Sequence, residues 1–151
     1  MDNLTVLFVD DEPDFVGSLI KRMKKRNINA VGAGSGEEAV ALLQSGRMNM
    51  DVVVLDVRMN GMDGIETLKA IKSINPLIEV IMLSGHARLS VAREGMELGA
   101  FDYLMKPVDL DELLYKLQDA FLKKTLQEKK IERLKAAGES GNDTLHAPDF
   151  T

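Results

Sequence analysis

The chain has 151 residues, of which 45% are hydrophobic and 28% are charged, a composition typical of one globular domain with little chain left over. The absence of cysteine excludes disulfides, thiolate metal sites and cysteine nucleophiles, and a pair of histidines argues against a structural zinc site. A net charge of −5 argues against direct nucleic-acid binding, and the lack of a long apolar run or a signal sequence predicts a cytoplasmic protein without membrane contact.

Five short apolar runs alternate with helical patterns along the chain. The runs lie at 4–9, 29–33, 51–55, 78–83 and 101–105. The third and fourth runs are continuously apolar, which is typical of strands that are covered on both faces. This alternation predicts an α/β fold in which a doubly wound, five-stranded parallel sheet carries helices on both faces.

Each of the first four helices has its own sequence signal. Pro13 is a good first-turn residue for the first helix, and a capping-box pattern begins at Ser35 before the second. The third helix is closed by Asn75, which precedes a proline. The fourth, at 89–98, contains Gly95 and few large apolar residues, so we expect it to be held weakly, which is what a moving element needs.

The fifth helix is predicted to begin at Asp109 or Asp111 and to run past the domain to about residue 137. Its apolar stripe is interrupted at Lys124 before it resumes at Ile131, so a coiled coil and a homodimer through this helix stay open. We expect a domain over 1–123, an extension of the last helix over 124–137 and a disordered tail over 138–151. The basic stretch 122–137 fits a solvated helix face, and a partner or nucleic-acid surface is the alternative.

The residues that follow the predicted strands carry the chemistry. Asp10 and Asp11 follow the first strand, Asp56 the third, Ser84 the fourth and Lys106 the fifth. The carboxyl ends of parallel strands meet at one edge of a sheet, so these side chains should converge. Carboxylates that crowd together need protons or a cation, and an all-oxygen site with few protein ligands favours Mg²⁺ over Ca²⁺.

Such a site suits phosphoryl chemistry. A carboxylate can attack phosphorus and form an aspartyl phosphate, while a cation and a lysine ammonium offset the charge of the transferred group. The hydroxyl of Ser84 can donate a hydrogen bond to a phosphoryl oxygen.

Four segments carry a family resemblance: FVDDE at 8–12, LDVRMNGMDG at 55–64, LSGH at 83–86 and GAFDYLMKP at 99–107. Together they resemble the receiver domain of response regulators in bacterial two-component signal transduction, over about residues 4–123. The resemblance implies the flavodoxin-like strand order 2-1-3-4-5 that chemotaxis regulators share.

The resemblance also implies the role of each acidic residue. Asp56 is expected to be the phosphoacceptor, which receives its phosphoryl group from a sensor histidine kinase or a phosphotransfer protein. Asp11, Asp56 and the backbone carbonyl of Arg58 are expected to ligate Mg²⁺ directly, and Asp10 through water.

The remaining roles follow from the same resemblance. Lys106 is expected to pair with the phosphate and to form a cis peptide bond with Pro107. Ser84 and Tyr103 are expected to be the switch pair, in which the hydroxyl moves toward the phosphate and the ring turns inward. Such a protein catalyses only its own phosphorylation and dephosphorylation, and it is not otherwise an enzyme.

The sequence departs from the family pattern at a few positions. Asn60 stands where a proline is common, which loosens the loop after Asp56, and serine at 84 replaces the commoner threonine. Arg58 and His86 lie two residues past Asp56 and Ser84, at the mouth of the site. We hypothesise that these two side chains shield the acyl phosphate and slow its hydrolysis.

Two other functional classes compete with the signalling receiver. A phosphohydrolase of the haloacid dehalogenase type would need a second acid where Arg58 stands, and it would need chain for a cap domain. A phosphorylation-independent interaction module would not need the intact acidic and lysine set. Residues 124–151 are too few for a DNA-binding output domain, so the sequence predicts a protein contact as output, or an output domain elsewhere, and names no downstream target.

Overall fold

The computed structural model describes residues 3–59, 61–85 and 89–144. Its centre is a parallel sheet in the order β2-β1-β3-β4-β5, which confirms the predicted fold and strand order. The strands are β1 (Thr5–Val9), β2 (Asn29–Ala33), β3 (Val52–Asp56), β4 (Glu79–Ser84) and β5 (Asp102–Met105). The helices are α1 (Pro13–Lys24), α2 (Gly36–Gln44), α3 (Gly64–Ile74), α4 (Leu89–Glu97) and α5 (Leu110–Thr144).

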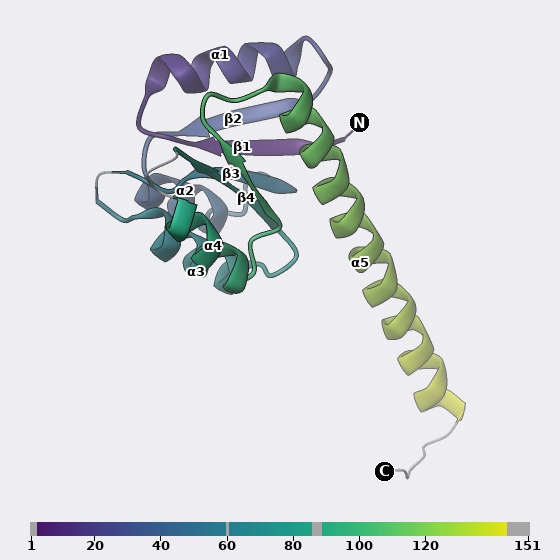
Figure 1. The fold of residues 1–151 in the computed structure, drawn as a ribbon. Helices are drawn as coiled ribbons and strands as arrows, with labels where there is room; N and C mark the ends of the chain where they lie inside the picture. Colours follow the sequence, from purple (N-terminus) through teal and green to yellow (C-terminus); the bar gives the residue numbers. More distant parts are fainter. Residues whose placement is uncertain (1–2, 60, 86–88, 145–151) are drawn as a thin grey trace.

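The sheet is covered on both faces, as Figure 1 shows. Helices α1 and α5 pack on one face, and α2, α3 and α4 lie on the other. Successive residues of a strand point to opposite faces, so Val52 and Val54 join the α1/α5 side while Val53 and Leu55 join the other. Both faces of the central strands are therefore apolar, which explains their continuous hydrophobic runs.

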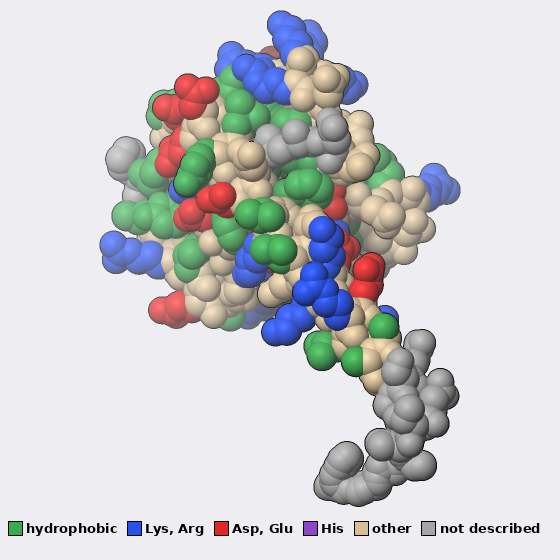
Figure 2. Space-filling model, turned by 90° about the vertical axis from the view of Figure 1, so that its right-hand side faces the viewer, with side chains coloured by type: hydrophobic (Ala, Val, Ile, Leu, Met, Phe, Trp, Pro, Cys, Tyr) green, Lys and Arg blue, Asp and Glu red, His purple; other side chains and the backbone are tan. Residues whose placement is uncertain are grey.

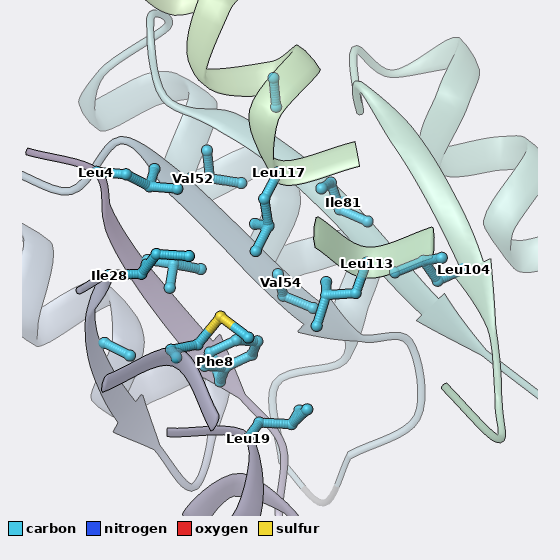
Figure 3. Packing of buried hydrophobic residues seen from close by; sticks show 14 of the residues in the cluster. Leu4, Phe8, Leu19, Ile28, Val52, Val54, Ile81, Leu104, Leu113 and Leu117 are labelled. Atoms are coloured by element: carbon cyan, nitrogen blue, oxygen red, sulfur yellow. The ribbon is translucent and has the colours of Figure 1, made fainter. Parts of the chain in front are cut away.

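The core on the α1/α5 side joins distant parts of the chain. Figure 3 shows Phe8 of β1 near Leu19 of α1 and Val54 of β3 next to Leu113 of α5, with Leu117 of α5 over the same face. These side chains are at most 5% exposed. Burial of a leucine or phenylalanine side chain contributes roughly 2 kcal/mol, so this cluster holds the first half of α5 firmly on the sheet.

Helix α4 is anchored by small residues, in line with the expectation of a weakly held element. Its buried residues are Ala92 and Gly95. A Cβ atom at Gly95 would lie 3.2 Å from Cγ of Met82, so the glycine lets the helix approach β4 closely. The segment that joins β4 to α4 includes residues 86–88, which lie outside the described residues.

Helix α5 is longer than the sequence predicts. The boundary near residue 137 rests on Gly138, but the helix continues to Thr144, so the predicted tail is helical over 138–144 and its remainder lies outside the described residues. A single glycine weakens a helix by about 1 kcal/mol relative to alanine, which an established helix tolerates because each further residue adds a hydrogen bond. No helix of the described chain is both long and apolar enough to cross a membrane.

The interruption of the apolar stripe at Lys124 is a buried ion pair. Lys124 is 6% exposed, and its Nζ lies 3.0 Å from Oδ1 of Asp51 and 2.9 Å from Oε2 of Glu128. The other oxygen of Asp51 accepts a hydrogen bond from the backbone N–H of Thr5 at 2.8 Å. The lysine thus joins α5 to the amino-terminal ends of β1 and β3, at the edge of the sheet opposite the strand ends that carry Asp10 and Asp56.

A second group of charged residues, two lysines around one glutamate, involves the residue next to Lys124. The neighbouring Lys123 and Lys72 of α3 both reach the buried Glu79 at the start of β4, with Nζ to Oε1 distances of 3.6 and 3.7 Å. Beyond Glu128 the side chains of α5 are exposed as far as Gly138, so these pairs mark the point at which the helix leaves the domain. Lys and Arg side chains gather along this part of α5 in Figure 2.

Replacing Lys124 by methionine should lower the free energy of unfolding by about 3 kcal/mol, because it leaves the buried carboxylate of Asp51 unpaired. The double variant D51N/K124M should lose less, since both charges are removed. Urea unfolding measures the differences, with the exposed Lys130→Met as the control. Equal stability of the two single lysine variants would contradict the buried-pair interpretation.

Candidate functional site

Three carboxylates meet at the carboxyl ends of β1 and β3. Asp10 and Asp11 directly follow β1, and Asp56 is the last residue of β3, whose register pairs it alongside β1. One oxygen from each carboxylate lies within 4.8 Å of the others. Asp10 and Asp56 are buried, while Asp11 is exposed. The convergence expected from the strand ends is therefore present.

Backbone N–H groups hold two of these carboxylates in place. Oδ1 of Asp10 accepts a hydrogen bond from the N–H of Glu12 at 3.0 Å, and Oδ1 of Asp56 accepts one from the N–H of Arg58 at 3.2 Å. Each bond spans two residues and turns the chain directly after the strand. Both side chains are therefore fixed by the turns that follow them.

Lys106 brings a positive charge to the cluster from the end of β5. Its Nζ lies 2.9 Å from Oδ2 of Asp10, 3.5 Å from Oδ2 of Asp56 and 3.4 Å from Oε1 of Glu12. The same ammonium lies 4.9 Å from the centre of the Phe15 ring. Lys106 thus contacts two of the three carboxylates and is positioned by an aromatic side chain of α1.

The pKa of Asp56 is raised above its ordinary value of 3.8, chiefly because burial disfavours the charged carboxylate. The nearby charge of Asp10 raises this pKa further, while the Arg58 N–H and Lys106 oppose the shift. Burial by itself would lower the pKa of Lys106, but its hydrogen bond to Asp10 and the charge of Asp56 outweigh burial, and the pKa is raised. The cluster therefore still carries an uncompensated cost for its negative charge.

This donor set fits a hard divalent cation. All three side chains offer carboxylate oxygen, the ligand atom that Mg²⁺ and Ca²⁺ prefer. A cation would also remove the repulsion that raises the pKa of Asp56. The side-chain ligands that the cluster offers are Asp10, Asp11 and Asp56.

Among the other predicted residues, Ser84 and Lys106 lie at the carboxyl ends of their strands, while Tyr103 is the second residue of β5. Ser84 ends β4 fully buried, and its hydroxyl donates a hydrogen bond to the Gly85 carbonyl oxygen at 2.9 Å. Tyr103 of β5 packs partly buried against the core on the α2/α3/α4 side. The peptide bond between Lys106 and Pro107 is cis, the isomer that the resemblance implies.

The last two predicted residues concern the mouth of the site. Arg58 is exposed two residues after Asp56, where the sequence places it. His86, the second residue of this prediction, lies outside the described residues.

Sequence reasoning assigned no role to Glu12 and Phe15, although both contact Lys106. Glu12 stands in the same acidic run as Asp10 and Asp11, so its position after β1 was an available signal. Phe15 reads as part of the apolar face of α1, and nothing in the sequence marks it as a neighbour of a lysine that is 91 residues away (106 − 15).

The raised pKa of Asp56 gives a prediction for the metal-free protein. A carboxyl whose pKa is higher in the folded state destabilises the fold once it is ionised, so stability decreases as pH rises from 3.8 through the raised pKa. Asp56→Asn should therefore unfold at higher urea concentration than the wild type at pH 7 in the presence of a chelator. The advantage should shrink as the pH falls through this window, and an advantage that grows in acid would refute the assigned cause.

Comparisons with known proteins identify the family of this chain. The family model described as the response regulator receiver domain matches residues 6–118. The transcriptional regulatory protein ZraR of Escherichia coli (strain K12) is 40% identical over 119 residues, which are 79% of this chain and 26% of ZraR. The chain therefore spans about a quarter of the length of this curated relative.

Solved structures give the same result. A response regulator receiver domain protein from Clostridium thermocellum superposes with a TM-score of 0.78 at 31% identity, covering 82% of this chain and 98% of that one. NtrX from Brucella abortus superposes with a TM-score of 0.79 at 26% identity, covering 87% of this chain and 29% of NtrX. With its fold, its strand-end carboxylates and a family model that matches most of its length, this chain belongs to the response regulator receiver domain family.

Proposed function

We propose that the chain is a phosphorylation-controlled switch that accepts a phosphoryl group on Asp56. The observation that carries this proposal is a buried carboxylate at the centre of an acidic cluster, with the ammonium of Lys106 at 3.5 Å. The donor is a phosphohistidine of a sensor kinase or of a phosphotransfer protein. No substrate other than its own phosphoryl group is proposed.

In the transfer step, a carboxylate oxygen of Asp56 attacks phosphorus. The oxygen–phosphorus bond forms, the phosphorus–nitrogen bond of the phosphohistidine breaks, and the imidazole leaves with the bonding electrons. A bound Mg²⁺, held by Asp11, Asp56 and the Arg58 carbonyl with Asp10 through water, would offset charge on the phosphoryl oxygens. Lys106 turns from Asp10 toward the new phosphoryl group, because a doubly charged partner attracts it more strongly.

The switch is proposed to follow from this change in charge. The Ser84 hydroxyl exchanges the Gly85 carbonyl oxygen for a phosphoryl oxygen, and Tyr103 turns inward behind it. Helix α4, which Ala92 and Gly95 anchor to the sheet, is the neighbouring element that gives way most easily. A partner then recognises the altered surface around α4, β5 and α5.

We propose a receiver domain over 1–123 and an extension from residue 124 that connects it to an output. ZraR is named a transcriptional regulatory protein, and we propose control of transcription as the output that this receiver domain would serve. The exposed Leu126, Ile131 and Leu134 on the extension would serve a homodimer. Binding to nucleic acid is not proposed for the receiver domain itself, given the chain's net charge of −5.

Incubation with Mg²⁺ and acetyl phosphate, followed by intact-mass measurement, should add one phosphoryl group to the wild type and none to Asp56→Asn. Omission of Mg²⁺ should slow the wild-type reaction strongly, because charge on the transferred group is then less well offset. A wild type that stays unmodified with several small phosphodonors would favour the phosphorylation-independent interaction module.

The side chains at the mouth of the site should set how long the phosphoryl group persists. We expect the double variant R58A/H86A to lose it about threefold to tenfold faster, since water reaches the acyl phosphate more easily. The half-life is measured by mass after removal of the phosphodonor, with Arg93→Ala on α4 as a control. An unchanged half-life would disprove the shielding hypothesis.

A further inference from the structure

The loop between β3 and α3 carries a ligand of the proposed cation site and is fixed at both ends. At its start, the N–H of Arg58 donates a hydrogen bond to Asp56. At its end, Asp63 and Glu66 form a reciprocal capping box at the beginning of α3. Between these two points, the described residues of the loop include Gly61 and Met62.

A side chain from another element reaches this middle part. Oε2 of Glu37, in the first turn of α2, accepts a hydrogen bond from the backbone N–H of Met62 at 3.0 Å. The two residues are 25 positions apart in the sequence. The bond therefore ties the loop to a different helix rather than to its own neighbours.

Gly61 makes this approach feasible. Its φ of +78° is a conformation that favours glycine, and a Cβ atom here would lie 2.8 Å from Oε2 of Glu37. The missing side chain leaves the carboxylate lying directly against the loop backbone. The positive φ of Gly61 and its lack of a side chain thus allow the hydrogen bond between Glu37 and Met62.

The base of this contact is itself rigid. The Ser35 side chain caps α2 by accepting a hydrogen bond from the N–H of Glu38 at 3.1 Å. Gly36 lies so close to Thr67 and Met62 that a Cβ atom would collide with the Thr67 hydroxyl. The first turn of α2 is therefore packed against α3 and the loop, and it can serve as a fixed support for Glu37.

We propose that Glu37 is a positioning residue for the phosphorylation site, through the loop that it holds at Met62. By fixing that loop, it sets the backbone of Arg58, whose carbonyl completes the proposed Mg²⁺ site beside Asp56. The inference rests on the proposed function for its role in phosphorylation. Its physical content, the tie between Glu37 and the cation site, is testable without phosphorylation.

Charge and hydrogen bonding are separable at this position. Glu37→Ala removes both the negative charge and the hydrogen-bond acceptor. Glu37→Gln removes the charge and retains an oxygen that can accept from the Met62 N–H. If Glu37 acts by holding the loop, glutamine restores the wild-type behaviour and alanine does not.

The chain provides a matched control next to Glu37. Glu38 carries the same charge in the same helical turn, but its carboxylate accepts from the N–H of Gly34 at 2.7 Å, away from the loop. Glu38→Ala therefore changes net charge and helix composition in the same way as Glu37→Ala. Any effect common to both variants is not due to the Met62 contact.

The experiment measures Mg²⁺ affinity by NMR titration, amide hydrogen exchange at Met62, and the rate of phosphorylation by acetyl phosphate. We expect Glu37→Ala to weaken Mg²⁺ binding about threefold to tenfold, which corresponds to the loss of one charge-assisted hydrogen bond. Amide hydrogen exchange at Met62 should become faster in this variant. Glu37→Gln and Glu38→Ala should stay within about twofold of the wild type on the same scale. Thermal melting checks that each variant is folded.

Each outcome separates this inference from the proposed function. Wild-type Mg²⁺ affinity in Glu37→Ala would overturn the inference, and so would equal weakening by glutamine and alanine. If no donor phosphorylates the wild type but Glu37→Ala binds Mg²⁺ more weakly than the wild type, the positioning role is supported and the proposed function fails. Slower phosphorylation of Glu37→Ala together with weaker Mg²⁺ binding would support both.

Discussion

The arrangement at the site depends on mutual repulsion among carboxylates that the fold holds together. Asp10 and Asp56 are buried beside each other at the ends of β1 and β3, and Lys106 offsets only part of their charge. Burial keeps the pKa of Asp56 raised even with that lysine nearby. Binding of a cation at this cluster would relieve the repulsion between the carboxylates.

The packed sheet supplies the rigidity that this crowding requires. The central strands are buried on both faces, so the carboxyl ends of β1 and β3 cannot separate without exposing core residues such as Phe8 and Val54. In contrast, α4 is anchored through Ala92 and Gly95. If the proposed switch operates, we therefore expect α4 to be an element that moves, because small residues anchor it to the sheet.

Much of the fold was predictable because its signals are local. The continuous apolar runs at β3 and β4 and the proline in the first turn of α1 follow from burial and backbone geometry. Parallel topology then brings Asp10, Asp56 and Lys106 together. Contacts that depend on exact side-chain reach were not predictable. Glu37 at Met62 and Phe15 below Lys106 join residues whose spacing carries no periodic signal.

The end of α5 shows the same limit. Gly138 suggested a stop, since glycine disfavours helix, yet the helix passes through it. Lys124 read as an interruption of an apolar stripe, whereas its ammonium is buried against Asp51. In both cases a residue type that usually marks a boundary is accommodated by the structure around it.

The firm attachment of α5 at Lys123 and Lys124 makes the rest of the helix a lever. A helix rises about 1.5 Å per residue, so the part after Glu128 is roughly 24 Å long. A tilt of about 10° at its attachment would move the far end by roughly 4 Å, which exceeds the donor–acceptor distance of a hydrogen bond, about 3 Å. A small rotation within the receiver would thus reach whatever lies beyond the helix as a change in position that side chains can sense.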